Sequence, residues 1–154
     1  HTVGDDRDFF IVDTYHAVAG LCAGHAARRV LAEGIIRLGI SNQSVEEALD
    51  MDSGDLRKWY MHNTSHWIGL DVHDVGIYKP NGEPRLLEAG MCLTVEPGLY
   101  FGAWRPDVDC PERYANIGIR IEDDVLVTSG DPDVLTSACP KSIEDIEAIT
   151  GTPF

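Results

Sequence analysis

Four short β-rich runs in the second half of the chain limit its fold more than any other feature of the sequence. The runs MCLTV, GLYF, IGIRI and DVLVT lie within residues 91–128 and are separated by proline, glycine and aspartate. Short runs of β-branched and aromatic residues with such breaks are typical of strands joined by tight turns. The sequence therefore predicts an antiparallel sheet over this part of the chain.

Two helical patterns precede these strands. Apolar residues repeat at helical spacing from about residue 15 to 38, and Gly39 offers a C-terminal stop. Ser44 and Glu47 match a capping box, which predicts a short second helix that ends near Asp50. The linker from there to Trp59 is predicted to be exposed.

A last helix is predicted after the strands, from Ser142 to Gly151, with Ile143, Ile146 and Ile149 three residues apart. Helix first, sheet next and helix last indicates an α+β fold with helices packed on an antiparallel sheet. At 154 residues, of which 44% are hydrophobic, the chain is long enough for one domain with a real core.

Charge and composition bear on partners and location. The formal net charge of -14 repels nucleic-acid backbones and anionic membranes, so neither is an expected partner. The apolar runs are short, and the first residues lack a basic segment followed by an apolar one, so neither a membrane span nor a signal peptide is expected. The scattered cysteines form no C-x-x-C pair, and we expect a cytoplasmic location.

The stretch HNTSHWIGLDVHDVG, residues 62–76, holds three of the six histidines. The spacing of His62 and His66 would suit a zinc clamp on a helix, but the residues between them are poor helix formers. The alternative is that both are ordinary hydrogen-bonded histidines. The same ordinary role is expected for His1, His16 and His25.

Two further segments carry charged side chains on strands. In TVEPGLY, Pro97 favours an extended backbone at Glu96 and a sharp turn after it. In IGIRIEDD, strict alternation places Arg120 and Glu122 on one face. These charges could be a solvated sheet edge. Together with a histidine, however, the carboxylates form the N/O ligand set that suits zinc, manganese or iron.

The order and separation of three segments are specific. HNTSHWIGLDVHDVG, GMCLTVEPGLYF and GIRIEDDVLVT resemble the three C-terminal motifs of aminopeptidase P, the Xaa-Pro aminopeptidase among the pita-bread metallopeptidases. The resemblance extends from LAEGIIRLGI upstream to SIEDIEAI downstream. It implies the C-terminal half of the pita-bread (creatinase/aminopeptidase) fold, and residues 1–154 as a single, partial catalytic domain.

The resemblance implies a metal site. His66, Glu96 and Glu122 match the metal-ligating histidine and two glutamates of the family, with Glu122 in the bridging position. The expected cofactor is a divalent metal, manganese first, with zinc, cobalt or iron as alternatives. The family uses two ions to make a hydroxide nucleophile from water.

The resemblance also implies three catalytic residues. His62 and His73 match two further active-site histidines beside the substrate, which stabilise the tetrahedral intermediate by hydrogen bonding. Arg120 matches an arginine that orients nearby carboxylates. Asp71 and Asp74 are expected either to contact the residues that hold the metal, without binding it themselves, or to form turns.

One part of the family pattern is absent. Two upstream aspartates complete the two-ion site in the family, and the surroundings of Asp5, Asp6, Asp8 and Asp13 do not match them. Glu96 and Glu122 supply two negative charges, which balance one divalent ion but not two. We therefore expect one ion or none in this chain.

Two classes of function follow. The first is an Xaa-Pro aminopeptidase that acts on peptides with proline in the second position. The alternative is a non-catalytic binding or regulatory half-domain, or a fragment that lacks the two upstream aspartates. Since the family fold has two similar halves, this half alone would expose an apolar sheet edge, and we expect a homo-oligomer or a complementary half-domain as partner.

Overall fold

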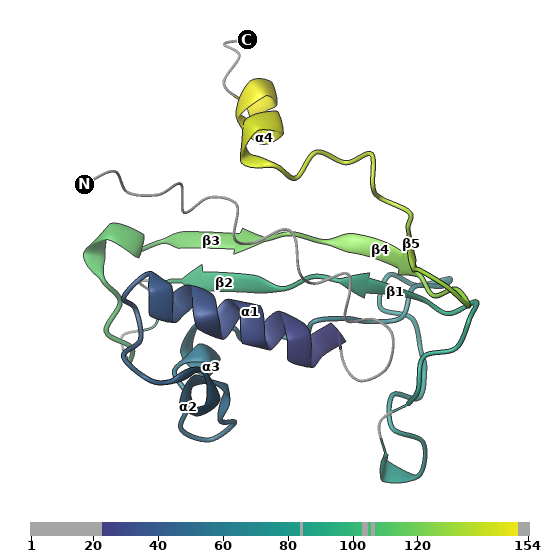
Figure 1. The fold of residues 1–154 in the computed structure, drawn as a ribbon, viewed down its shortest axis with the longest axis horizontal. Coiled ribbons are helices and arrows are strands. Elements are labelled where there is room, and N and C mark those ends of the chain that lie inside the picture. Colours follow the sequence, from purple (N-terminus) through teal and green to yellow (C-terminus); the bar gives the residue numbers. More distant parts are fainter. Residues whose placement is uncertain (1–22, 84, 103–104, 106, 151–154) are drawn as a thin grey trace.

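A computed structural model of the chain describes residues 23–83, 85–102, 105 and 107–150 (Figure 1). Three helices come first, five strands follow, and a helix ends the described chain. The elements are α1 (Ala23–Arg37), α2 (Val45–Leu49), α3 (Leu56–Trp59), β1 (Cys92–Val95), β2 (Gly98–Phe101), β3 (Ile117–Arg120), β4 (Asp123–Leu126), β5 (Asp133–Val134) and α4 (Ile143–Thr150), with short 3-10 turns at Pro80–Gly82 and Glu112–Tyr114. This order confirms the α+β prediction.

All strand pairs are antiparallel, as predicted. β4 lies between β1 and β5, and β2 pairs with β3. In Figure 1, β1 and β2 lie in line and point the same way, with β4 and β3 in line beside them. The predicted sharp turn after Glu96 is therefore wrong. The chain continues in the same direction, and Pro97, which has no N–H to donate, only interrupts the ladder between the two strand pairs.

The two strand pairs share one register on either side of this break. Val95 faces Asp123 in one pair, and Gly98 faces Arg120 in the other. Carrying either register into the gap places Glu96 directly opposite Glu122. Directly opposite residues of an antiparallel pair have Cβ atoms about 4.5–5.5 Å apart, so the ladder itself brings these two carboxylates together.

α1 lies along the sheet, and α2 and α3 pack below it (Figure 1). The predicted end of α1 is confirmed, with Gly39 at a φ of 69°, while the start of the predicted helix lies outside the described residues. The predicted exposure of the linker before Trp59 holds for residues 51–53, 57 and 58 but not for Leu56, which is buried. Trp59 is also buried and packs against Phe101. The buried core cluster contains Leu31, Ala32, Ile35, Ala48, Leu56, Trp59, Tyr60, Leu99 and Phe101.

The capping box of α2 is confirmed. The Ser44 hydroxyl accepts from the Glu47 backbone N–H, and the Glu47 carboxylate accepts from the Ser44 N–H. The last predicted helix also forms, and the Asp145 N–H donates to the Ser142 hydroxyl. α2 buries Ala48 in the core, whereas no residue of α4 is buried.

This contrast between the two caps gives a test. Ser44→Ala is expected to lower the free energy of unfolding by about 1 kcal/mol, because α2 contributes to the core and loses a cap. Ser142→Ala removes the same hydroxyl from a helix that buries nothing and is expected to leave the urea midpoint unchanged. Equal effects of the two variants would contradict this description of the core.

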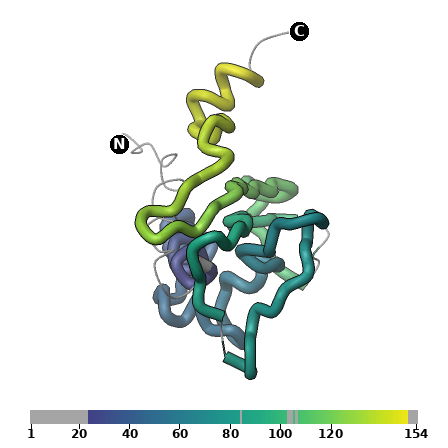
Figure 2. Tube along the Cα trace, turned by 90° about the vertical axis from the view of Figure 1, so that its right-hand side faces the viewer, coloured from purple at the N-terminus to yellow at the C-terminus, as the bar shows by residue number. Residues whose placement is uncertain are grey.

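Apolar side chains are exposed on several parts of the surface, among them β3. Ile119 on β3 is 56% exposed, and Ile117 on the same strand is also exposed, which agrees with the expected apolar sheet edge. α4 projects from the body of the molecule, as Figure 2 shows. None of the helices within the described ranges combines the length and apolar character needed to cross a membrane.

Candidate metal centre

The residues around His66 form an extended segment beside β1. The Thr94 N–H donates to the His66 carbonyl at 3.0 Å, and the Glu96 N–H donates to the Thr64 carbonyl at 2.8 Å. Trp67 makes an isolated bridge with Leu93. The segment contains no helix, so the rejection of a helical zinc clamp is confirmed. The segment around His66 therefore lies beside β1, so the motifs of His66, Glu96 and Glu122 are neighbours in the fold although they are distant in sequence.

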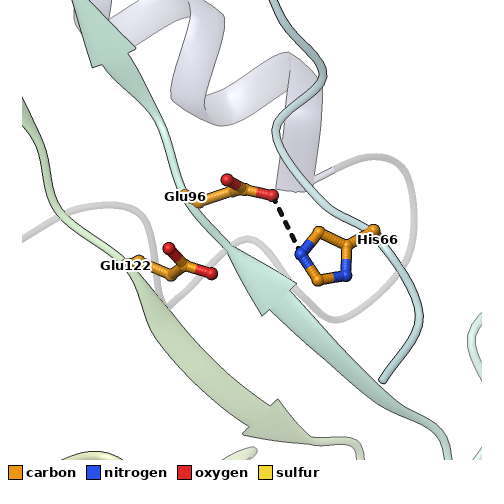
Figure 3. A group of neighbouring side chains, drawn as sticks. All are labelled: His66, Glu96 and Glu122. Atoms are coloured by element: carbon orange, nitrogen blue, oxygen red, sulfur yellow. Dashed lines mark ion pairs between the residues drawn. The ribbon is translucent and has the colours of Figure 1, made fainter. Parts of the chain in front are cut away.

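His66, Glu96 and Glu122 converge, as the sequence predicts. One ligand atom from each lies within 4.8 Å of the other two, and among the described residues this is the group of His, Cys, Asp and Glu side chains that could hold an ion. The His66 Nε2 lies 3.3 Å from Glu96 Oε1. Figure 3 shows the imidazole and both carboxylates directed toward a common space. Glu96 is only 8% exposed, while Glu122 is exposed.

The tautomer of His66 suits a cation. Its Nδ1 lies 3.0 Å from the Trp67 carbonyl oxygen, which can only accept, so Nδ1 carries the proton. In the neutral ring, Nε2 is then an acceptor that faces the acceptor oxygen of Glu96. Two acceptors that face each other repel unless a proton or a metal ion lies between them. Histidine ligands of metals commonly donate their other N–H to a carbonyl in this way.

Arg120 lies beside both carboxylates of the group. Its Nη1 is 3.6 Å from Glu96 Oε2, and its Nε is 3.8 Å from Glu122 Oε2. The prediction that Arg120 and Glu122 share a face therefore agrees with their contact. A guanidinium at these distances offsets part of the repulsion between the two glutamates.

His62 is held in a separate hydrogen-bonded group. Its Nδ1 donates to the Asn63 carbonyl at 2.7 Å, so Nε2 accepts from the Tyr100 hydroxyl at 2.9 Å. The Tyr60 ring stands edge-on to His62, and burial raises the pKa of Tyr60, whose hydroxyl bonds to Thr64. Tyr100 was not among the site residues predicted from the sequence. Strand alternation from Glu96 would have placed it on the same face.

His73 approaches His66 from an exposed bend. The two rings meet edge to face with centroids 4.4 Å apart. The Asp74 N–H donates to the Trp67 carbonyl at 3.1 Å and so closes the loop of residues 67–74, while Asp71 lies in an exposed bend of that loop, in agreement with the turn expected there. His25 lies exposed on α1, apart from the group. The predictions for His1, His16, Asp5, Asp6, Asp8 and Asp13 lie outside the described residues.

A cavity of about 560 Å³ opens on the histidine side of the group. His62, His66 and Trp67 line it, whereas Glu96 and Glu122 do not. Cationic side chains also border it: Arg28, Lys79 and Arg85. The arrangement thus combines a candidate ion site with space for a small molecule beside its histidine.

Comparisons with known proteins identify the family of the chain. Residues 17–129 match the profile of Metallopeptidase family M24. The chain is 46% identical over 121 residues to an Xaa-Pro aminopeptidase of Escherichia coli and 45% identical over 119 residues to one of Haemophilus influenzae. These matches cover 79% and 77% of this chain but 26% of each relative, so the chain spans about a quarter of their length.

Solved structures give the same relationship. The aminopeptidase PepP of Pseudomonas aeruginosa matches with a TM-score of 0.80 and 39% identity, over 90% of this chain and 31% of that one. A zinc-substituted aminopeptidase P of Escherichia coli in complex with product matches with a TM-score of 0.74 and 39% identity, over 90% and 32% of the two chains. The expected fold, the C-terminal part of the pita-bread arrangement, is that of these neighbours.

Proposed function

This chain belongs to metallopeptidase family M24, and on that premise we propose that it forms part of an Xaa-Pro aminopeptidase. The proposed reaction is hydrolysis of the peptide bond between an N-terminal residue and a following proline. The observation that carries the proposal is the convergence of His66, Glu96 and Glu122 within 4.8 Å. Residues 1–154 would then be one partial catalytic domain.

The proposed cofactor is one divalent ion held by His66 Nε2 and by carboxylate oxygens of Glu96 and Glu122. Two carboxylates balance one such ion, and the mixed N/O set suits manganese first, with zinc, cobalt or iron as alternatives. A bound ion of this kind lowers the pKa of water and so supplies a nucleophile near neutral pH.

The surrounding residues have proposed roles that follow from their positions. His73, whose ring borders His66, lies where it could donate a hydrogen bond to charge that develops on a substrate carbonyl. His62 would take the same role once its Nε2, which accepts from Tyr100 in this structure, gains a proton and turns to the substrate. Arg120 keeps Glu96 and Glu122 in place by facing both carboxylates. The 560 Å³ cavity beside the histidines offers room for a short peptide.

The test of catalysis uses the purified chain with manganese and a tripeptide that has proline in the second position. Release of the N-terminal residue above the level of a Glu96→Ala variant is expected, because that variant loses a charged ligand. A tripeptide with alanine in the second position is the matched substrate control. Equal release by the wild-type chain and Glu96→Ala would reject catalysis by this chain alone.

The alternative proposal is a non-catalytic binding or regulatory half-domain, or a fragment that another chain completes. It is supported by charge, since the candidate site among the described residues has two carboxylates. Calorimetry with manganese and zinc separates the proposals. One weak site or none favours the half-domain, one tight site favours the enzyme, and two tight sites per chain would contradict the half-domain. Restored turnover on mixing with an upstream half would identify a fragment.

We also propose a homo-oligomer or a complementary half-domain as partner, because Ile117 and Ile119 are exposed along β3. The net charge of -14 argues against nucleic acid and anionic membranes as partners. Free thiols at Cys92, Cys110 and Cys139 are in keeping with a cytoplasmic location, which we propose on that ground.

A further inference from the structure

Thr94 links two of the candidate ligands through one hydroxyl group. It lies on β1, two residues before Glu96, and is 2% exposed. Its Oγ1 is 3.0 Å from the backbone nitrogen of His66 and 3.2 Å from Glu96 Oε1. Strand alternation explains why the side chains of Thr94 and Glu96 share a face.

The chemistry of the three groups fixes the direction of both hydrogen bonds. The His66 N–H can only donate, so Thr94 Oγ1 must accept from it. An ionised Glu96 can only accept, so the one hydroxyl proton of Thr94 must point at Glu96 Oε1. No other orientation of the hydroxyl satisfies both neighbours. The hydroxyl is therefore a fixed connector between the backbone of one ligand and the carboxylate of the other.

We propose that Thr94 is a positioning residue of the metal centre, setting the distance and orientation between His66 and Glu96 before an ion binds. This inference rests on the proposed metal site. Thr94 is not one of the proposed ligands, and its hydroxyl is too deeply buried to reach a substrate.

The other contacts of Glu96 cannot replace this hydroxyl. Arg120 is 3.6 Å from the second carboxylate oxygen and is itself about half exposed, so it attracts Glu96 without fixing its rotation. His66 Nε2 presents an acceptor and gives no hydrogen bond in the tautomer that the Trp67 carbonyl selects. Loss of a group that orients a metal ligand typically lowers metal affinity by about 10–100-fold.

The experiment compares three variants of the whole chain by manganese titration calorimetry and thermal unfolding. Thr94→Val keeps the shape of the side chain and removes the hydroxyl. Thr94→Ser keeps the hydroxyl and removes the methyl group. Thr64→Val is the matched control, since Thr64 is also buried on the adjacent segment but its hydroxyl bonds to Tyr60.

The expected result is a manganese affinity about 10–100-fold weaker in Thr94→Val, with affinity within about threefold of wild type in Thr94→Ser and Thr64→Val. If Thr94 had only a structural role, each variant would lose manganese affinity in proportion to its loss of thermal stability. Thr64→Val and Thr94→Val would then behave alike, and that pattern would overturn the inference. Equal affinity of Thr94→Val and wild type would overturn it while the metal site stands. A wild-type chain that binds no manganese would contradict the metal site and this inference together.

Discussion

A Glu96→Gln variant is expected to lose manganese binding by roughly 100-fold or more, because a direct ligand should matter at least as much as the groups that orient ligands. The substitution keeps the length and shape of the side chain and removes one of the two negative charges at the site. Glu96 is nearly buried, and its carboxylate faces His66 Nε2 at 3.3 Å and Arg120 at 3.6 Å. Titration calorimetry of the purified chain measures the effect.

The control for this experiment is Glu144→Gln. Glu144 is exposed on α4, so its substitution changes the net charge of the chain by the same amount at a distance from the candidate ligands. Manganese affinity close to wild type is expected for this control. If both variants bound equally well, nonspecific attraction to an acidic chain would explain manganese binding, and Glu96 would have no part in it.

Lys141→Met is expected to destabilise the chain by about 3–5 kcal/mol, because it leaves a buried carboxylate without its counter-charge. Lys141 is 15% exposed at its side chain, and its Nζ lies 3.0 Å from Asp123 Oδ1, which is 1% exposed. The same ammonium donates to the carbonyls of Thr136 and Cys139 at 3.0 and 2.9 Å. The pair thereby ties the segment before α4 to the strand that follows Glu122.

The matched control is Lys58→Met, which breaks another lysine–aspartate pair of the chain. Lys58 bonds to Asp55 at 2.6 Å, but its side chain is 47% exposed, so its loss is expected to cost at most about 1 kcal/mol. Urea unfolding followed by tryptophan fluorescence gives both values. The double variant Lys141→Met with Asp123→Asn is expected to recover part of the loss. Equal costs for the two lysine variants would refute the buried ion pair.

Local patterns predicted most of the elements. The capping box at Ser44, the helix stop at Gly39 and the four β-rich runs all follow from short-range chemistry, and the structure confirms them. α3 was missed because four residues are too few to show a helical period. Its burial depends on contacts of Trp59 with Phe101, a partner distant in sequence.

The error at Glu96 has a related cause. Proline restricts the residue before it and removes one N–H, but it does not determine whether the chain turns or continues. Here the pairing of β1 with β4 and of β2 with β3 decides, and the same register runs through the break. That register, which local sequence does not encode, places Glu96 opposite Glu122.

The candidate site was predictable as a set of residues but not as an arrangement. Alternation along the strand predicted that Arg120 and Glu122 share a face, and the resemblance assigned His66 to them. Alternation from Glu96 also reaches Thr94 and Tyr100, which were overlooked because neither is a usual ligand for a metal. The Thr94 hydroxyl lies 3.2 Å from Glu96, and the Tyr100 hydroxyl lies 2.9 Å from His62. Only the fold establishes these two contacts.

The most direct test of the metal centre is the anomalous scattering of manganese in crystals of this chain. The expected result is one strong peak per chain between His66 Nε2 and the carboxylates of Glu96 and Glu122, at bonding distance from all three. A peak at another position, or its absence at a manganese concentration that saturates binding in solution, would contradict the account.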